Sequence, residues 1–184
     1  MRTELEHRLA RSRSLLAEHG IDAALIGPSA DFRYLTGQPA SPSERLLALV
    51  LPCDGEPVLV VPELEAPRFA EVGVGTVLRW KDGEDPLQLL ASQLERFAAH
   101  TIGVNDEFWA AFLLPLQERL PNRRFVRGSP LLQTLRIVKS PAELALLREA
   151  VARVDAAWAR FCASEQLVGR TERQIAWRLT ELLL

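Results

Sequence analysis

The sequence contains few of the residues that most often bind metals or act as nucleophiles. It has three histidines and two cysteines in 184 residues. His7, His19 and His100 occur in no HExxH or HxxxH pattern, and Cys53 and Cys162 occur in no CxxC or CxxH pattern. We therefore predict no catalytic residue and no metal ligand in this chain. The histidines are expected on helix surfaces or at helix ends, and the cysteines as reduced thiols.

An excess of charge and a long apolar run are also missing. Lysine and arginine total 22 against 24 acidic residues, a net charge of −2, which provides no basic surface for a nucleic acid or an anionic membrane. The longest apolar run, Leu46–Leu51, is too short to span a bilayer, and the segment MRTELEHRLARSR contains no signal-peptide core. We expect a cytoplasmic protein without nucleic-acid or membrane partners.

A dinucleotide-binding glycine pattern is incomplete. Gly73 and Gly75 form a GxG pair, but no third glycine follows at the required spacing, so the pair is interpreted as a turn before a strand. The tryptophans fall on predicted strands or helices, and core packing is their expected role. They are Trp80, Trp109, Trp158 and Trp177.

What the sequence does contain is an alternation of short apolar runs and amphipathic helices. A first helix carries inward leucines and ends at Gly20. The runs 46–51 and 58–61 are separated by proline, aspartate and glycine, which predicts an antiparallel pair. Further strands are expected at 22–26, 75–80, 102–104 and 124–126, helices at 62–71, 86–99, 106–119 and 130–135, and a small segment at 31–35. The alternation predicts an α/β fold.

A strong helix start follows at Ser140. Its hydroxyl can accept a bond from the backbone N–H of Glu143, the Glu143 carboxylate can reach back to Ser140, and Pro141 occupies the first helical position. Apolar residues then recur at steps of three and four, so one face of this helix requires a partner. They are Leu144, Leu147, Val151, Val154, Trp158 and Phe161.

A second capped helix follows Gly169. Thr171 and Gln174 form another capping box, and a new apolar stripe begins at Ile175. The chain stops in apolar residues, Leu182–Leu184, that need partners. From this we expect a truncated protein whose last two helices pack on a neighbouring copy or are poorly ordered.

The loop Thr36–Glu44 is the best functional candidate in the first domain. It is rich in glycine, proline and serine, so it could form a lid or a binding segment. A mobile surface loop without a specific role remains an equal alternative. The candidate substrate-access residues in and beside it are Phe32, Tyr34, Gly37, Gln38 and Arg45.

Three segments together resemble a known family. Arg136–Leu144, reading RIVKSPAEL, is similar to the linker of the Xaa-Pro peptidases, the group of prolidase, aminopeptidase P and creatinase, with Arg136, Lys139, Ser140 and Glu143 as its motif residues. Phe32–Gly37, reading FRYLTG, resembles the segment after the first strand of that family. Gly103, Val104, Glu107 and Phe108 resemble the turn into its third large helix.

The resemblance implies a domain organisation. Residues 1–130 would form an N-terminal α/β domain of the creatinase/prolidase type, with a mixed sheet of about five or six strands flanked by helices. Residues 131–139 would form the linker, and 140–184 the first helices of an incomplete catalytic "pita-bread" domain.

The resemblance also implies a metallopeptidase. In such relatives the C-terminal domain binds two divalent metals (manganese, cobalt or zinc) through carboxylates and a histidine, and a metal-bound hydroxide attacks the bond preceding proline. Those ligands would all follow Leu184, so none is assigned here. The N-terminal domain would support a homodimer and shield the partner's active site, with loop 36–45 reaching toward the other subunit. Xaa-Pro dipeptidase activity on proline-containing dipeptides is the preferred expectation. Aminopeptidase P and a non-catalytic interaction module are the alternatives.

Overall fold

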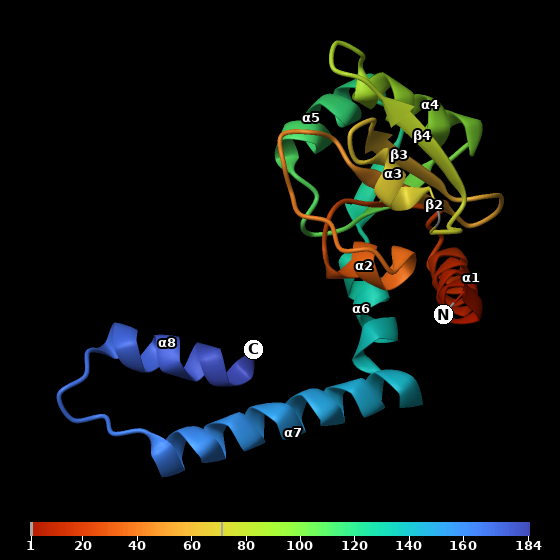
Figure 1. Cartoon of the computed structure of the whole chain (residues 1–184). Coiled ribbons are helices and arrows are strands. Elements are labelled where there is room, and N and C mark those ends of the chain that lie inside the picture. The colour runs from red at the N-terminus through yellow and green to blue at the C-terminus, as the bar shows by residue number, and fades with distance from the viewer. Residues whose placement is uncertain (1, 71) are drawn as a thin grey trace. The chain divides into compact units, whose positions relative to one another are not determined.

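The computed structural model describes residues 2–70 and 72–184. The chain divides into two compact units, Met1–Ile137 and Val138–Leu184, each considered by itself (Figure 1). The last residue of the helix expected at 62–71 lies outside the described residues. Among the described residues, no helix combines the length and the apolar character needed to cross a membrane.

A six-stranded mixed sheet with the strand order β4-β3-β2-β1-β5-β6 forms the centre of the first unit. Strand β2 runs antiparallel to β1 and β3, whereas the β3–β4, β1–β5 and β5–β6 pairs are parallel. The strands are β1 (Ala23–Ile26), β2 (Ala48–Pro52), β3 (Val58–Pro62), β4 (Thr76–Trp80), β5 (Thr101–Val104) and β6 (Arg124–Arg127). The expected α/β fold and the antiparallel pairing of the two central apolar runs are confirmed.

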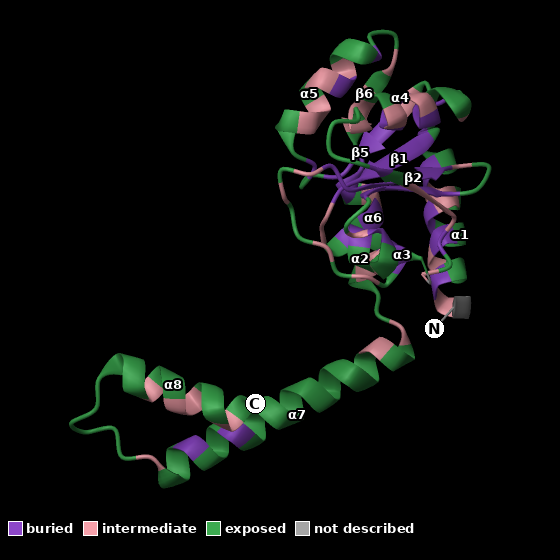
Figure 2. Ribbon diagram, turned by 45° about the horizontal axis from the view of Figure 1, so that its top comes forward, coloured by how far each residue is buried: buried purple, intermediate pink, exposed green. Residues whose placement is uncertain are grey.

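The inner strands are buried on both faces, which explains their continuous apolar sequences. All residues of β1, β2 and β3 are buried, as expected for a sheet covered on two sides. Helices α1 (Arg2–Glu18), α2 (Ala30–Thr36), α3 (Ala66–Phe69) and α6 (Ser129–Ile137) cover one face, and α4 (Pro86–Arg96) and α5 (Ala110–Arg119) cover the other (Figure 2). One apolar core therefore lies on each side of the sheet.

The sequence predicts no secondary-structure type for the segment at 31–35. In the structure it lies in α2, which begins where the Ser29 hydroxyl accepts the backbone N–H of Phe32. One local expectation requires correction. Helix α5 begins at Ala110 instead of Asp106. The Asp106 carboxylate is bound by Arg127 through two bonds of 2.6 Å, and the preceding residues form a turn instead of a helical start.

The second unit consists of α7 (Pro141–Ser164) and α8 (Glu172–Leu183). Both predicted capping boxes are present. On α7 only Ala157 and Phe161 are buried. Four members of the predicted stripe are 50–58% exposed: Leu147, Val151, Val154 and Trp158. Within the described residues, most of the apolar face of α7 therefore has no cover.

The tryptophans do not all behave as predicted. Trp80 is buried, and its indole N–H donates to the Leu46 carbonyl oxygen at 2.9 Å. Trp109, Trp158 and Trp177 are exposed, so the expectation of core packing is wrong for these three. Trp158 and Trp177 lie on α7 and α8, whereas Trp109 directly precedes α5. An apolar stripe on a helix predicts the need for a partner but does not supply one.

Candidate functional site

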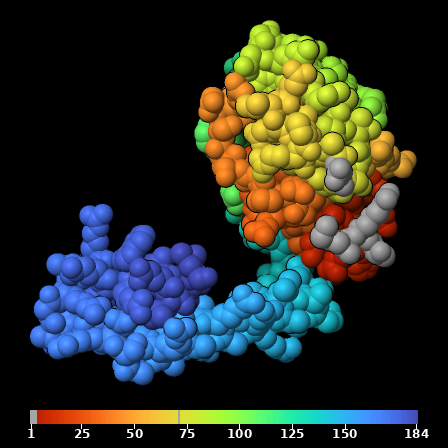
Figure 3. Space-filling model, viewed as in Figure 1, coloured from red at the N-terminus to blue at the C-terminus, as the bar shows by residue number. Residues whose placement is uncertain are grey.

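The candidate loop begins directly after α2 and lies on the surface of the first unit, in orange in Figure 3. Gly37 ends α2 in the left-handed conformation, with φ 73°, and its N–H donates to the Arg33 carbonyl oxygen. The Thr36 hydroxyl then accepts the N–H of Gln38 at 3.1 Å. The backbone N–H groups of Gly37 and Gln38 therefore attach the start of the loop to α2, one through a backbone carbonyl and the other through the Thr36 hydroxyl.

The two aromatic candidates have different surroundings. Phe32 is fully buried and packs edge-to-face on Phe69, with ring centroids 5.9 Å apart. Tyr34 is half-buried, and the Arg8 guanidinium lies 4.6 Å from its ring centroid. Arg8 also donates to the Tyr34 carbonyl oxygen at 3.1 Å. Both rings hold α2 in place from inside the unit.

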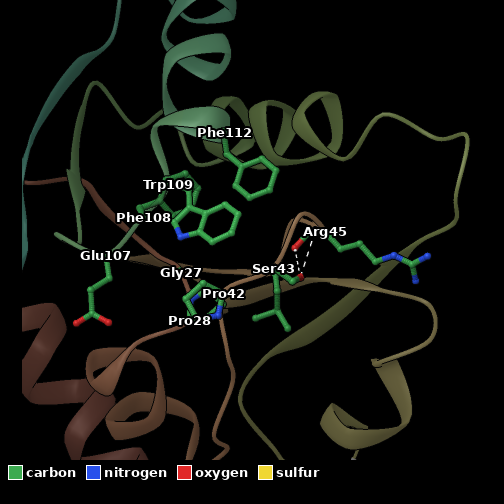
Figure 4. A pocket seen from close by; sticks show the side chains of 10 residues that line it. Gly27, Pro28, Pro42, Ser43, Arg45, Glu107, Phe108, Trp109 and Phe112 are labelled. Atoms are coloured by element: carbon green, nitrogen blue, oxygen red, sulfur yellow. Dashed lines mark hydrogen bonds between the residues drawn. The ribbon is translucent and has the colours of Figure 1, made fainter.

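Arg45, at the far end of the loop, forms an ion pair. Its guanidinium donates to Asp82 Oδ2 at 2.8 Å, and the Ser43 hydroxyl closes a tight turn by accepting the Arg45 N–H at 3.2 Å. In Figure 4 the guanidinium extends away from the neighbouring hollow. Because this pair is largely exposed, it contributes little to stability.

A small hollow separates the loop from the carboxyl ends of β1 and β5. Its walls are Gly27, Pro28, Pro42, Ser43, Arg45, Leu47, Glu107, Phe108, Trp109 and Phe112 (Figure 4). The carboxyl ends of parallel strands are where ligands of open α/β sheets usually bind. The hollow measures only about 10 Å³, which is close to the space for one water molecule. It cannot enclose a dipeptide.

Trp109 is one of three residues of this hollow, with Glu107 and Phe108, that the predicted helix 106–119 placed wrongly. Its side chain is 43% exposed and stacks on Phe112, with ring centroids 6.3 Å apart and an interplanar angle of 10°. Trp109 directly precedes α5 as its N-terminal cap residue. The predicted helical start at Asp106 had placed the indole inside a helix.

The linker motif contacts a residue that sequence reasoning missed. Arg136 Nη1 donates to Asp31 Oδ1 at 2.7 Å, and the Ser129 hydroxyl donates to Asp31 Oδ2 at 3.2 Å. Asp31 is only 4% exposed. Ser140 and Glu143 form the capping box of α7. In the sequence, Asp31 could be recognised only as an acidic residue that favours the start of a helix. Nothing in its neighbourhood indicated that Arg136 binds it.

Asp106 and Cys53 are two titratable groups of the first unit whose pKa values are shifted by their surroundings. Hydrogen bonds from Arg127 hold the pKa of Asp106 below its usual range, so this carboxylate stays paired and charged. Burial, followed by the nearby charge of Asp22, raises the pKa of the Cys53 thiol, whose Sγ donates to the Ile21 carbonyl oxygen at 2.8 Å. A raised pKa favours the less reactive thiol over the thiolate.

The described residues do not fit a metal centre. Within residues 2–70 and 72–184, no group of three or more histidine, cysteine, aspartate or glutamate side chains is placed to hold a metal ion. The pair of divalent metals that the resemblance implies therefore has no binding site among these residues.

Known proteins match the chain in both sequence and structure. Residues 8–138 match the creatinase/prolidase N-terminal domain. The probable dipeptidase PepE of Mycobacterium tuberculosis is 37% identical over 96% of this chain and 48% of its own length. Dipeptidase PepE from Mycobacterium ulcerans superposes with a TM-score of 0.86 at 38% identity, over 98% of this chain and 49% of that chain. Prolidase from Thermococcus sibiricus superposes with a TM-score of 0.89 at 25% identity, over 97% and 49%.

These matches extend along nearly all of this chain, but the chain spans only about half the length of the curated relatives it matches. The matched region includes the sheet, the loop after α2 and the Arg136 contact. The chain belongs to the creatinase/prolidase N-terminal domain family.

Proposed function

We propose that this chain serves as the N-terminal portion of a cytoplasmic Xaa-Pro dipeptidase. The observation that carries the proposal is the 38% identity to a dipeptidase of known structure over 98% of the chain. The match of residues 8–138 to the creatinase/prolidase N-terminal domain points to the same assignment. The substrates would be dipeptides with proline in the second position.

The proposal divides the chain as the resemblance does. Residues 1–130 form the N-terminal domain, 131–139 the linker, and 140–184 the first helices of the catalytic domain. Hydrolysis would depend on two divalent metals (manganese, cobalt or zinc). Because the described residues do not fit a metal centre, that chemistry is assigned to polypeptide outside residues 1–184. This chain alone would be inactive.

In this proposal the N-terminal domain supports a homodimer and limits access to the active site. The loop 36–45 is the proposed access segment, because it lies on the surface and carries exposed polar residues. The uncovered apolar face of α7 fits a role in which further polypeptide packs on it. Burial of each leucine or valine there would contribute roughly 1.5–3 kcal/mol.

Two alternatives use the same architecture. An aminopeptidase P would remove an N-terminal residue from longer peptides with proline in the second position. A non-catalytic interaction module would lack metal-binding carboxylates in the second half of the protein. Both leave the fold of the present chain unchanged, so neither the sheet nor the loop distinguishes them from the dipeptidase.

The test uses the product of the gene read past the codon for Leu184. That product is assayed with manganese or cobalt against Ala-Pro and against a tripeptide of the Ala-Pro-Xaa type. The dipeptidase proposal predicts hydrolysis of the dipeptide and little or none of the tripeptide. Preferential cleavage of the tripeptide would support aminopeptidase P. A product without metal-binding carboxylates and without activity would support the interaction module.

A further inference from the structure

The Asp31 carboxylate holds both ends of α6. Oδ2 accepts the hydroxyl of Ser129, the first residue of α6, and Oδ1 accepts the guanidinium of Arg136, in its last turn. The Ser129 oxygen also accepts the backbone N–H of Asp106 at 2.8 Å. The start of α6 is thereby attached to the carboxyl end of β5 as well. A single buried side chain thus contacts α6 at its first residue and in its last turn.

Asp31 lies in a buried, capped turn of α2. It lies in the first turn of α2, where a negative charge is favoured by the helix dipole. The Ser29 hydroxyl caps the same turn by accepting the Phe32 N–H at 3.0 Å. Phe32 is fully buried behind it. Because Asp31 is almost completely buried, removal of Arg136 would leave a charge without its partner in the interior.

Helix α2 leads into the candidate loop, and α6 leads to the end of the first unit. Helix α2 ends at Gly37, and the hydrogen bonds of Gly37 to Arg33 and of Gln38 to Thr36 attach the start of the candidate loop to it. Helix α6 ends at Ile137, where the first unit ends, and it contains most of the proposed linker 131–139. The Asp31–Arg136 bond joins the helix before the loop to the helix of the linker, across 105 residues of sequence.

We propose that the Asp31–Arg136 ion pair couples the linker to the loop that begins at Gly37. In this device Arg136 and Asp31 are positioning residues: they contact no substrate, and they set the position of the loop through α2. When the last turn of α6 is displaced, Arg136 displaces Asp31 and with it α2. The displacement of α2 then shifts the first residues of the loop. The proposal stands independently of the dipeptidase assignment, because it concerns only contacts within the first unit.

The test measures amide hydrogen exchange in the 184-residue chain by NMR. Arg136→Met removes the charge and keeps most of the side-chain volume. We expect exchange at the Gly37 and Gln38 amides to accelerate at least tenfold, while amides of the central strand β1 change much less. In the Asp31→Asn/Arg136→Met double variant, these amides should exchange no faster than in Arg136→Met, because the Asp31–Arg136 bond is already lost in the single variant and an asparagine oxygen can still accept the Ser129 hydroxyl.

Arg119→Met is the matched control. Arg119 pairs with Asp85 at the same distance of 2.7 Å, and its side chain is 34% exposed against 33% for Arg136. This variant should leave Gly37 and Gln38 unchanged. If Arg136→Met does not fold, Arg136→Lys carries the test, with a smaller acceleration at the same amides. Fraying confined to the last turn of α6, with Gly37 and Gln38 unaffected, would overturn the proposal. So would an equal acceleration in Arg119→Met.

Discussion

Replacement of Phe32 by alanine should destabilise the first unit by about 3–5 kcal/mol, the usual cost of a buried phenylalanine truncation. The ring is completely buried, and it packs edge-to-face on Phe69 with centroids 5.9 Å apart. Roughly 0.5–1.5 kcal/mol of the loss belongs to this aromatic pair, and the rest to lost burial and to the cavity. The loss tests whether this residue of the FRYLTG segment acts as a core anchor or as a ligand contact.

Urea unfolding followed by circular dichroism, together with amide exchange in β1, measures the change in the free energy of unfolding. At about 2–4 °C per kcal/mol, the melting temperature of the first unit should fall by roughly 6–20 °C. Arg33→Ala is the control, because Arg33 lies next to Phe32 on the exposed side of α2, and its cost should stay within about 0.5 kcal/mol. A cost below about 1 kcal/mol for Phe32→Ala would refute the reasoning.

Three further changes test other parts of the structure. Gly75→Ala should destabilise the first unit severely, measured by thermal melting, because Gly75 has φ +69° and an added Cβ would lie 1.9 Å from the Pro57 carbonyl oxygen. Hydrogen bonds, above all from Arg178, hold the pKa of Glu165 below its usual value. This stabilisation is therefore complete above the unfolded pKa and is lost as the pH falls through the lower folded pKa. Amide protection factors in the loop between α7 and α8, which correct for the intrinsic pH dependence of exchange, should fall below about pH 4, and Glu165→Gln should remove that fall; wild-type protection factors that stay constant with pH would contradict the assignment. Ser140→Ala should cost about 1 kcal/mol by removing the helix cap, seen as faster exchange confined to the first turn of α7.

The sequence predicted the elements whose signals are local. The inner strands β1, β2 and β3 are continuous apolar runs bounded by turn residues, and the cap at Ser140 depends on residues within one helical turn. The start of α5 could not be predicted in this way. Asp106 is a good helix-starting residue by its type, but in the fold its carboxylate is bound by Arg127 from a neighbouring strand. Asp106 therefore contacts a segment that is distant in the sequence, and a local pattern does not report such a contact.

The candidate site shows the same division. Arg136 was identified from its linker motif, and the loop after Gly37 from its composition. Asp31, the residue that connects them, lies 105 positions from Arg136. No local pattern specifies such a pairing. Trp109 was misplaced for a related reason, because its exposure depends on where the turn after β5 ends and α5 begins.

We propose that this chain is the supporting half of a dipeptidase and that the hydrolytic chemistry belongs to the remaining half. Manganese-dependent hydrolysis of Ala-Pro should therefore be compared between the 184-residue chain and the product of the gene read past the codon for Leu184. We expect no hydrolysis above background by the chain alone and metal-dependent hydrolysis by the longer product. Metal-dependent turnover by residues 1–184, or an inactive longer product that nevertheless folds and binds manganese, would refute the proposal.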